Sequence, residues 1–208
     1  EMCIRDRSRG LERVDYHLIC HRTMEEPFPW FPIWGYEHDP TESVEEILAK
    51  FIETRPSDRW GLIRDGVIAS DRHAWAAWSM LRRLEFRGDC IARNPDTEFL
   101  RIISGTGQIA EAIKRSGLSG GEKKAWLFFL PVDGTGSPLS GEGVSTEFYN
   151  EHSDRANHLI ASIGGELLPN RPVPSRSGLH KIRMTEYDGG YLGLEEAFLL
   201  HLSNSIIN

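Results

Sequence analysis

The segment from Asn94 to Gly117 constrains the fold of this chain most, because apolar residues recur at helical spacing on both sides of a glycine-rich stretch. Asp96 is placed to cap a first short helix, and Gly117 is placed to end a second one in the left-handed conformation. The side chains expected inside are Phe99, Leu100 and Ile103 in the first helix, and Ile109, Ala112 and Ile113 in the second. The pattern predicts two helices joined by a tight elbow.

The elbow consists of Ser104, Gly105, Thr106, Gly107 and Gln108. Its glycines let another backbone approach closely, and it presents backbone N–H groups at the start of a helix. A helix N-terminus of this kind can bind a phosphate or another electron-rich group. The alternative is an ordinary joint between two helices that binds no ligand, and the pattern alone leaves both open.

Other helices are indicated by their caps. Asp39 is expected to cap one that carries Pro40 at its first position and Glu42 in a capping box. Its expected buried stripe is Val44, Ile47, Leu48, Phe51 and Ile52. A second helix is expected from Ser70 or Asp71 to about Arg87, with Gly88 as its stop. Two further helices are expected. One begins at Leu194 and is followed by a short strand, and the other is defined by Ala156, Leu159, Ile160 and Ile163.

Strands are expected at residues 60–63 and 67–69, paired as a hairpin across a turn at 64–66, and at 124–132 as a buried strand. Residues 13–21 are a candidate edge strand, and 133–143 and 170–177 are expected loops. Strands and helices mix without a regular βαβ repeat, so we expect an α+β fold with a mostly antiparallel sheet. We expect residues 9–208 to form one domain and residues 1–8 to be a non-native extension.

The segment from Glu26 to Tyr36 combines aromatic residues with three prolines. Because proline lacks a backbone donor and fixes φ, we expect neither a regular helix nor a central strand there. The aromatics between Phe28 and Tyr36 form either a lid over the protein's own core or a stiffened docking segment. The lid is the preferred interpretation.

Composition narrows the function. The formal net charge of −7 argues against a protein that holds nucleic acid by bulk electrostatics, so any RNA contact must be local. No run approaches the ~20 apolar residues that a membrane-spanning helix needs. The three cysteines, Cys3, Cys20 and Cys90, are scattered and odd in number, which favours reduced thiols and a cytoplasmic location.

No catalytic or metal-binding arrangement emerges from the motifs. His17, Cys20 and His21 are close in sequence, but a structural zinc site needs a fourth ligand and usually a Cys-x-x-Cys pair. No motif assembles a nucleophile, a base and an oxyanion donor, so we expect a non-enzyme without metal or cofactor.

Trp75 and Trp78 are three residues apart on one expected helix, and they either pack in the core or form a partner surface. The alternatives for His73 are a buried structural residue and a functional one.

The stretch Glu-Phe-Leu-Arg-Ile-Ile-Ser-Gly-Thr-Gly-Gln-Ile-Ala-Glu-Ala-Ile, which begins at Glu98, resembles the signature of the kinase-binding regulatory subunit of the KEOPS complex, the TPRKB family with its archaeal members. The resemblance extends to residues 67–78, similar to a strand-then-helix unit with a histidine near the helix start. Residues 125–130, 184–187 and 194–200 are similar to further segments of that family.

This resemblance implies a non-catalytic subunit in tRNA threonylcarbamoyladenosine modification that docks on a small atypical kinase acting as an ATPase. It also implies capture of the single-stranded 3′ CCA end of tRNA. The elbow residues, with nearby Lys114 and Arg115, are the expected tRNA contacts: backbone N–H groups for a phosphate, the Gln108 amide for a base edge, and basic side chains for local charge.

The competing hypothesis is a small-molecule-binding α+β domain, or a small enzyme, that uses residues 104–108 for a nucleotide or metabolite phosphate. A third hypothesis is an interaction scaffold that binds the kinase but does not bind RNA.

Overall fold

The protein is described by a computed structural model covering residues 30–132, 146–185 and 193–207. Four strands form one sheet in the order β2-β3-β1-β4, and every neighbouring pair is antiparallel. The strands are β1 (Ile33–Glu37), β2 (Trp60–Arg64), β3 (Lys124–Phe129) and β4 (Glu166–Leu168). The helices are α2 (Val44–Thr54), α3 (Asp71–Arg87), α4 (Pro95–Ile103), α5 (Ile109–Ser116), α6 (Thr146–Ser162), α7 (Arg176–Lys181) and α8 (Leu194–Ile207). This confirms the predicted α+β class with an antiparallel sheet.

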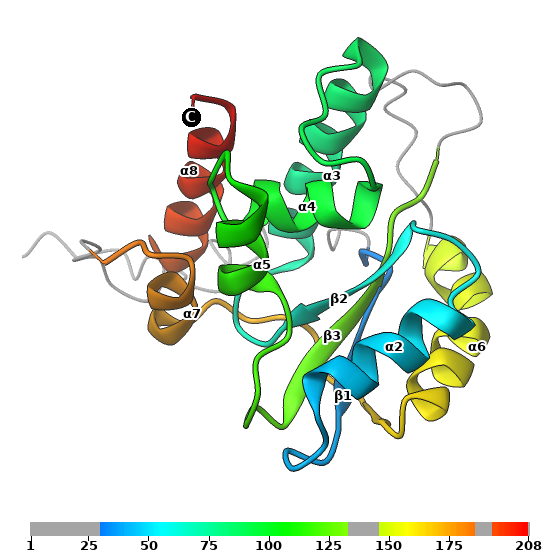
Figure 1. The fold of residues 1–208 in the computed structure, drawn as a ribbon. Coiled ribbons are helices and arrows are strands. Elements are labelled where there is room, and N and C mark those ends of the chain that lie inside the picture. The colour runs from blue at the N-terminus through cyan, green and yellow to red at the C-terminus, as the bar shows by residue number, and fades with distance from the viewer. Residues whose placement is uncertain (1–29, 133–145, 186–192, 208) are drawn as a thin grey trace, which may run out of the picture.

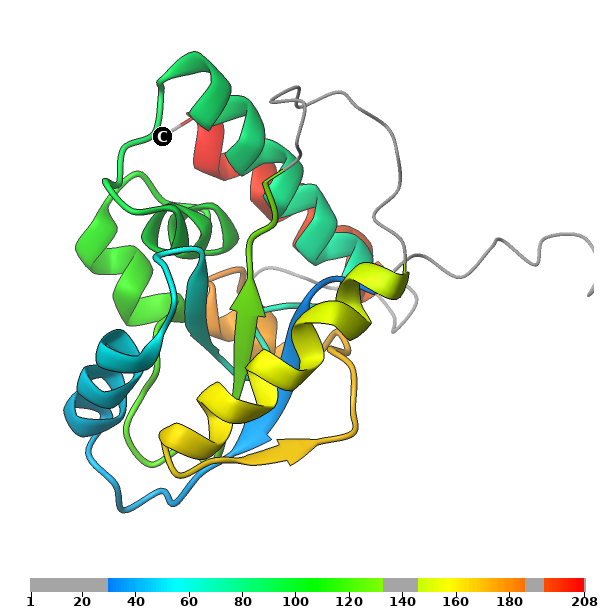
Figure 2. The same cartoon turned by 90° about the vertical axis from the view of Figure 1, so that its right-hand side faces the viewer.

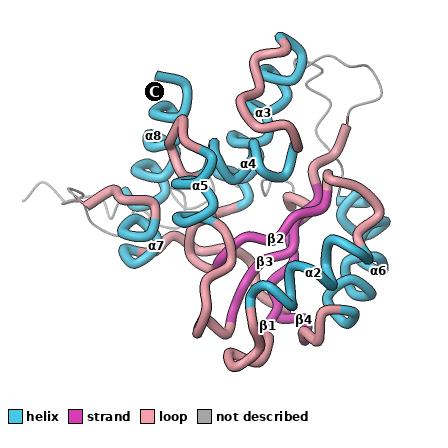
Figure 3. The backbone as a smooth tube through the Cα atoms, in the orientation of Figure 1, coloured by secondary structure: helices cyan, strands magenta, loops and turns pink. Residues whose placement is uncertain are grey.

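Helices cover both faces of the sheet, as Figures 1 and 2 show. Side chains alternate along each strand, so one face of β1 carries Ile33 and the other carries Trp34 and Tyr36. The Ile33 face packs against α3, α4, α7 and α8, and the Trp34 face packs against α2 and α6. The short helix α5 lies against α4 on the Ile33 side of the sheet (Figure 3).

β1 is an inner strand, which corrects the expectation for the proline-rich segment. It pairs with β3 on one side and β4 on the other. Within the described residues Pro32 stands just before the strand, where its carbonyl accepts from the Phe129 N–H at 2.9 Å. The strand itself contains no proline, so its ladder loses no donor. Trp34 and Tyr36 are buried on this inner strand, so they belong to the core itself and form neither a lid over it nor an exposed docking segment.

The predicted hairpin is also wrong. The chain turns at Gly66, which has a φ of 82°, but residues 67–69 continue as buried coil rather than as a second strand. α7 fills the space beside this turn. Its Gly178 lies so close to the Gly66 carbonyl that a Cβ on residue 178 would not fit. Among the described strands, β2 pairs with β3 alone. The N–H of Ala69 is satisfied instead by the Nδ1 of His73 at 3.3 Å.

α3 has the predicted limits. The Ser70 hydroxyl accepts from the His73 N–H at 3.1 Å, and Gly88 ends the helix with a φ of 74°. The Ala156-to-Ile163 pattern is confirmed as α6, and the 124–132 strand as the shorter β3. α8 stays helical to Ile207, so the predicted terminal strand is absent from the described residues.

The predicted caps of two helices were wrong because their carboxylates bind other partners. α2 begins after Ser43, while the Asp39 carboxylate accepts from the Thr41 N–H at 2.8 Å in a preceding turn. α4 begins after Asn94 with Pro95 at its first position, and Asp96 pairs with Arg55.

Gly117 ends α5 in an extended conformation, with a φ of −69°, and so is not a left-handed cap. Ile52 and Ile113, expected inside, are 59% and 50% exposed. Residues 1–29, with His17, Cys20 and His21, and the loop at 133–143 lie outside the described residues.

Candidate functional site

The predicted elbow exists between α4 and α5, but its first half is closed. Ser104 and Gly105 are buried, Thr106 and Gly107 are half-buried, and only Gln108 is exposed. The Ser104 hydroxyl donates to the Leu100 carbonyl. Ser104 and Gly105 therefore shape the elbow from inside, and contact with a ligand falls to Thr106, Gly107 and Gln108.

Gly105 is required by a close approach to α8. Its φ is 59°, in the left-handed region. A Cβ at this position would also collide with the ring of His201, lying 2.8 Å from Cε1. The elbow thus rests directly on the C-terminal helix.

Two arginines hold the elbow's carbonyl groups. Arg115 donates to the Ser104 carbonyl at 3.0 Å, and Arg101 donates to the Thr106 carbonyl at 3.2 Å. The elbow's N–H groups differ from these carbonyls: those of Thr106 and Gly107 have no hydrogen-bond partner among the described residues. The N–H of Gln108, expected to be available, instead donates to Thr106 Oγ1 at 3.2 Å.

The N-terminus of α5 is uncapped. Gln108 occupies the N-cap position with extended backbone, but its side chain makes no capping hydrogen bond. The first-turn N–H groups of Ile109, Ala110 and Glu111 have no protein acceptor among the described residues. Together with Thr106 and Gly107, they make a row of five backbone donors along the elbow and the helix start.

A buried ion pair that sequence reasoning missed supports this arrangement. Glu98 and Arg101 are 0% and 2% exposed, and their Oε1 and NH2 atoms lie 2.7 Å apart. Glu98 also accepts from the Ala92 N–H at 2.7 Å. The available signal was a Glu and an Arg three apart within the apolar run of Phe99, Ile102 and Ile103, where charged residues are not expected unless paired.

The two basic residues predicted near the elbow have different roles. Arg115 binds Glu111 at 3.0 Å in addition to the Ser104 carbonyl, so it positions the elbow. Its hydrogen bond lowers the pKa of the Glu111 carboxyl. Lys114 is exposed and lines an open groove of ≈ 450 Å³ beside the start of α2, with Glu42 and Glu45 on the other wall.

Trp75 and Trp78 both pack against the protein. Trp75 is 8% exposed and meets Phe31 edge-on with ring centroids 4.8 Å apart. Trp78 packs edge-on against Trp75 and donates its indole N–H to the Pro131 carbonyl at 2.9 Å. These contacts are those of core residues.

His73 is fully buried beneath α8, with its ring edge-on to Phe198. Burial, and then the neighbouring His201, lowers its pKa to about 3. Burial likewise lowers the pKa of His201. Both residues are therefore neutral near pH 7, and they serve the packing between α3, α8 and the elbow.

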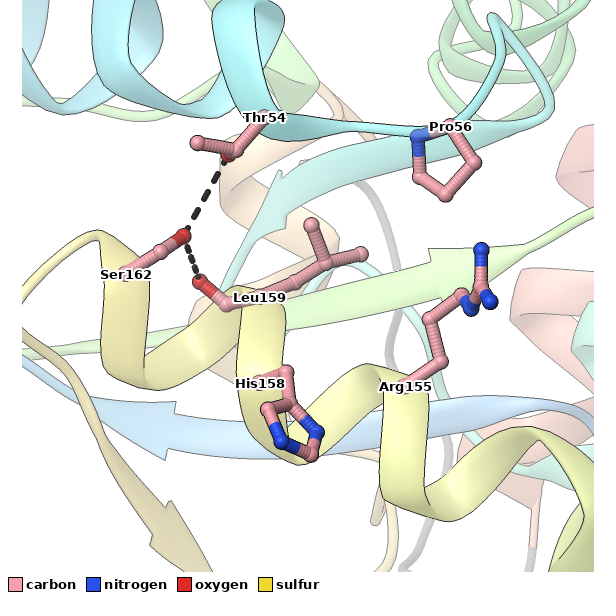
Figure 4. Close-up of a pocket in the computed structure, with 6 residues that line it drawn as sticks. All are labelled: Thr54, Pro56, Arg155, His158, Leu159 and Ser162. Carbon is pink, nitrogen blue, oxygen red and sulfur yellow. Dashed lines mark hydrogen bonds between the residues drawn. The ribbon is translucent and has the colours of Figure 1, made fainter.

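A second groove, of ≈ 360 Å³, lies between α2 and α6, on the other face of the sheet from the elbow. It is lined by Thr54, Pro56, Arg155, His158, Leu159 and Ser162 (Figure 4). The hydroxyls of Thr54 and Ser162 lie 3.3 Å apart at one end, and Ser162 donates to the Leu159 carbonyl. His158 Nδ1 lies 2.7 Å from the Asp154 carbonyl, so among the described residues no hydrogen bond joins this histidine to the Ser162 hydroxyl.

Within the described ranges, no group of three or more His, Cys, Asp and Glu side chains is arranged to hold a metal ion. Every described helix is too short or too polar to span a bilayer. No protein-family model matches the chain, and no curated protein matches it.

Proposed function

We propose that this chain is the non-catalytic, kinase-binding regulatory subunit of a KEOPS complex. In this role it acts in the cytoplasm in tRNA threonylcarbamoyladenosine modification, docks on the small atypical kinase/ATPase subunit, supports that subunit's activity and binds the 3′ CCA end of tRNA. The resemblance of residues 98–113 to that family is what suggests the complex. The site supports the RNA-binding part of the proposal.

The observation that carries the proposal is the row of five backbone N–H groups, those of Thr106, Gly107, Ile109, Ala110 and Glu111, that have no acceptor among the described residues. These donors lie at a helix N-terminus, where the helix dipole favours negative charge. A phosphate of an RNA strand would supply the missing acceptors. Because such recognition is local, it is compatible with the net charge of −7.

Side chains around the row would complete the contact. The exposed Gln108 amide can donate to and accept from a base edge, and the Lys114 ammonium adds a positive charge one helical turn further on. Arg101 would act indirectly, because it binds the Thr106 carbonyl and so fixes the peptide unit whose N–H belongs to Gly107. Arg115 would hold the elbow in place through the Ser104 carbonyl, whose peptide unit carries the Gly105 N–H that donates to Ile102. The chain's contribution is binding and orientation, and bond formation belongs to the other subunits.

One backbone donor can be removed without breaking α5. Proline is tolerated at the first position of a helix, and the preceding Gln108 is already extended, with a φ of −100° and a ψ of 117°. Ile109→Pro therefore deletes one backbone N–H. Ile109→Ala also removes the isoleucine side chain but retains that N–H, so it is the matched control. We expect Ile109→Pro to bind intact tRNA about tenfold more weakly than Ile109→Ala, the effect of one hydrogen bond to a charged acceptor.

The same comparison with tRNA lacking its CCA end should show no difference between the two variants. Gln108→Ala combined with Lys114→Glu should likewise weaken binding of intact tRNA only. Equal affinities of all variants for intact tRNA would remove the RNA site. Co-purification with a kinase-like partner tests the docking part separately.

The competing candidate, a nucleotide or metabolite phosphate at the same donors, gives a different result. ATP added to the isolated protein would then raise the melting temperature of Ile109→Ala but not of Ile109→Pro. A shift of this kind without tRNA binding would favour the small-molecule site.

A further inference from the structure

The tip of α3 carries the most exposed large apolar side chain among the described residues. Phe86 is 71% exposed, and Ile91, just after the helix, is 54% exposed. Gly88 ends α3 with a φ of 74° and turns the chain back toward α4. We call residues 83–93 the α3 tip, and Figure 1 shows it projecting at the edge of the helical layer.

Three exposed arginines belong to the same tip as Phe86. Arg83 lies three residues before Phe86 and four before Arg87, so it is next to each of them on the helix surface. Arg93 follows in the loop. All three are exposed, and none forms an ion pair with a described residue.

The nearest acid of the helix is already neutralised. Glu85 pairs with Arg82 on its own helix and with Arg59 at 2.6 Å. Asp89 is the one acid left among the exposed residues of the tip. On a chain whose net charge is −7, the tip is therefore a local excess of positive charge around an aromatic ring.

The tip loop and the elbow are supported by the same buried ion pair. Glu98 accepts from the N–H of Ala92 in the loop, and Arg101 donates to the carbonyl of Thr106 in the elbow. The two surfaces stand at opposite ends of α4, whose nine residues span about 14 Å at 1.5 Å per residue. A stacked single strand rises ~3.4 Å per nucleotide, so a few nucleotides would cover the length of α4.

We propose that the α3 tip is the base-stacking platform and second phosphate contact for the single-stranded RNA whose end binds the elbow. This inference rests on the proposed function and adds the component that the elbow lacks. Binders of single strands combine positive charge along the backbone with aromatic rings on which bases stack. Phe86 supplies the ring, Arg83 and Arg87 contact phosphates, and Arg93, in the loop just before α4, adds a further positive charge.

The test compares tip variants with matched controls elsewhere. Phe86→Ala is paired with Ile52→Ala, another exposed apolar residue on a helix, and Arg83→Glu/Arg87→Glu is paired with Arg155→Glu, an exposed arginine across the sheet. Because these side chains are exposed, thermal unfolding should match wild type. Intact tRNA and the same tRNA lacking its CCA end are the probes.

We expect Phe86→Ala to bind intact tRNA about tenfold more weakly, the effect of one lost base stack, and to bind trimmed tRNA like wild type. The double arginine variant should also reduce the slope of log affinity against log salt by about 1.4, since each single-strand phosphate contact contributes about 0.7. The two control variants should behave like wild type.

Wild-type affinity and salt slope in both tip variants, with Ile109→Pro still defective, would overturn the platform and leave the elbow site standing. The reverse result, defective tip variants and a normal Ile109→Pro, would overturn the elbow and support RNA binding at the tip. Loss of the kinase partner with unchanged RNA binding would show that the tip is a protein interface, which also overturns the inference.

Discussion

The carboxylate of Glu98 and the guanidinium of Arg101 form a buried ion pair whose outer hydrogen bonds hold two separate loops. On one side Glu98 binds Ala92, and on the other Arg101 binds Thr106. The pair therefore fixes where the α3 tip and the elbow lie relative to α4. Both surfaces that we propose for RNA depend on it.

Removing the cation should cost much of the protein's stability. Arg101→Met leaves the Glu98 carboxylate buried without its partner, so we expect the free energy of unfolding to fall by about 3–5 kcal/mol in urea titrations. Adding Glu98→Gln should recover part of this loss, because Gln is neutral and retains an oxygen for the Ala92 N–H.

The matched control is the exposed pair of Lys50 and Glu42, in which the Lys50 side chain is 50% exposed. Lys50→Met should leave the free energy of unfolding close to that of wild type, because exposed ion pairs contribute little to stability. A double variant less stable than Arg101→Met alone would show that the carboxylate charge is not what makes the single variant unstable.

Gly105→Ala should destabilise the protein by two separable effects. One is the left-handed backbone, worth about 1–2 kcal/mol, and the other is the collision with His201. Gly121→Ala isolates the first, since Gly121 has a φ of 79° and nothing within 4 Å of an added Cβ. In chemical denaturation Gly105→Ala should be the more destabilising of the two, and His201→Ala should narrow the difference. Equal losses at the two glycines would refute the close contact.

Local signals predicted the helices better than the sheet. α3 was found from Ser70 and Gly88 because a cap and a left-handed stop act within a few residues. β1 was missed because prolines dominate the sequence before it, whereas its inner position is set by pairing with β3, far along the chain. The false hairpin has the same origin: α7, more than 100 residues later, occupies the space beside Gly66.

The elbow was placed correctly between two helices, but its exposure was not. Ser104 was expected to be open, and it is buried because its hydroxyl turns back to the Leu100 carbonyl. Arg115 was expected to meet RNA, and the structure shows it bound to Ser104 and Glu111. Which side of a short helix faces inward depends on its neighbours, and the sequence pattern does not contain them.

Stability should decline in mild acid through His73. Its folded pKa of about 3 lies below the ordinary 6.5, so below pH 6.5 the unfolded chain binds a proton that the folded chain excludes. This contribution to stability is complete above pH 6.5 and is lost as the pH falls toward 3, at up to about 1.4 kcal/mol per pH unit. His73→Asn, which can still accept the Ala69 N–H, should flatten the dependence of unfolding free energy on pH between 6 and 4.

The control for this pH dependence is Phe198→Leu, which removes the ring contact with His73 without removing a titratable group. It should lower stability by a similar amount at each pH. An unchanged slope in His73→Asn would show that other groups cause the acid sensitivity.

Arg171 should be irreplaceable by lysine, because one guanidinium serves several partners at the start of β1. It donates to the carbonyls of Phe31 and Ile33 at 2.8 and 2.5 Å and pairs with Asp71. It also lies 5.1 Å from the ring centroids of both Trp30 and Tyr149. A lysine keeps the charge but cannot reach these partners together.

We expect Arg171→Lys to lower the free energy of unfolding by about 2 kcal/mol. Arg155→Lys, at an exposed residue beside the groove between α2 and α6, should stay within about 0.5 kcal/mol of wild type. When Arg171→Lys is introduced into the Asp71→Asn variant, the loss of unfolding free energy should be smaller than in wild type, because the two side chains belong to one network. Strictly additive losses would mean that Arg171 acts on the strand carbonyls independently of Asp71. In that case the anchoring of β1 would not depend on the start of α3.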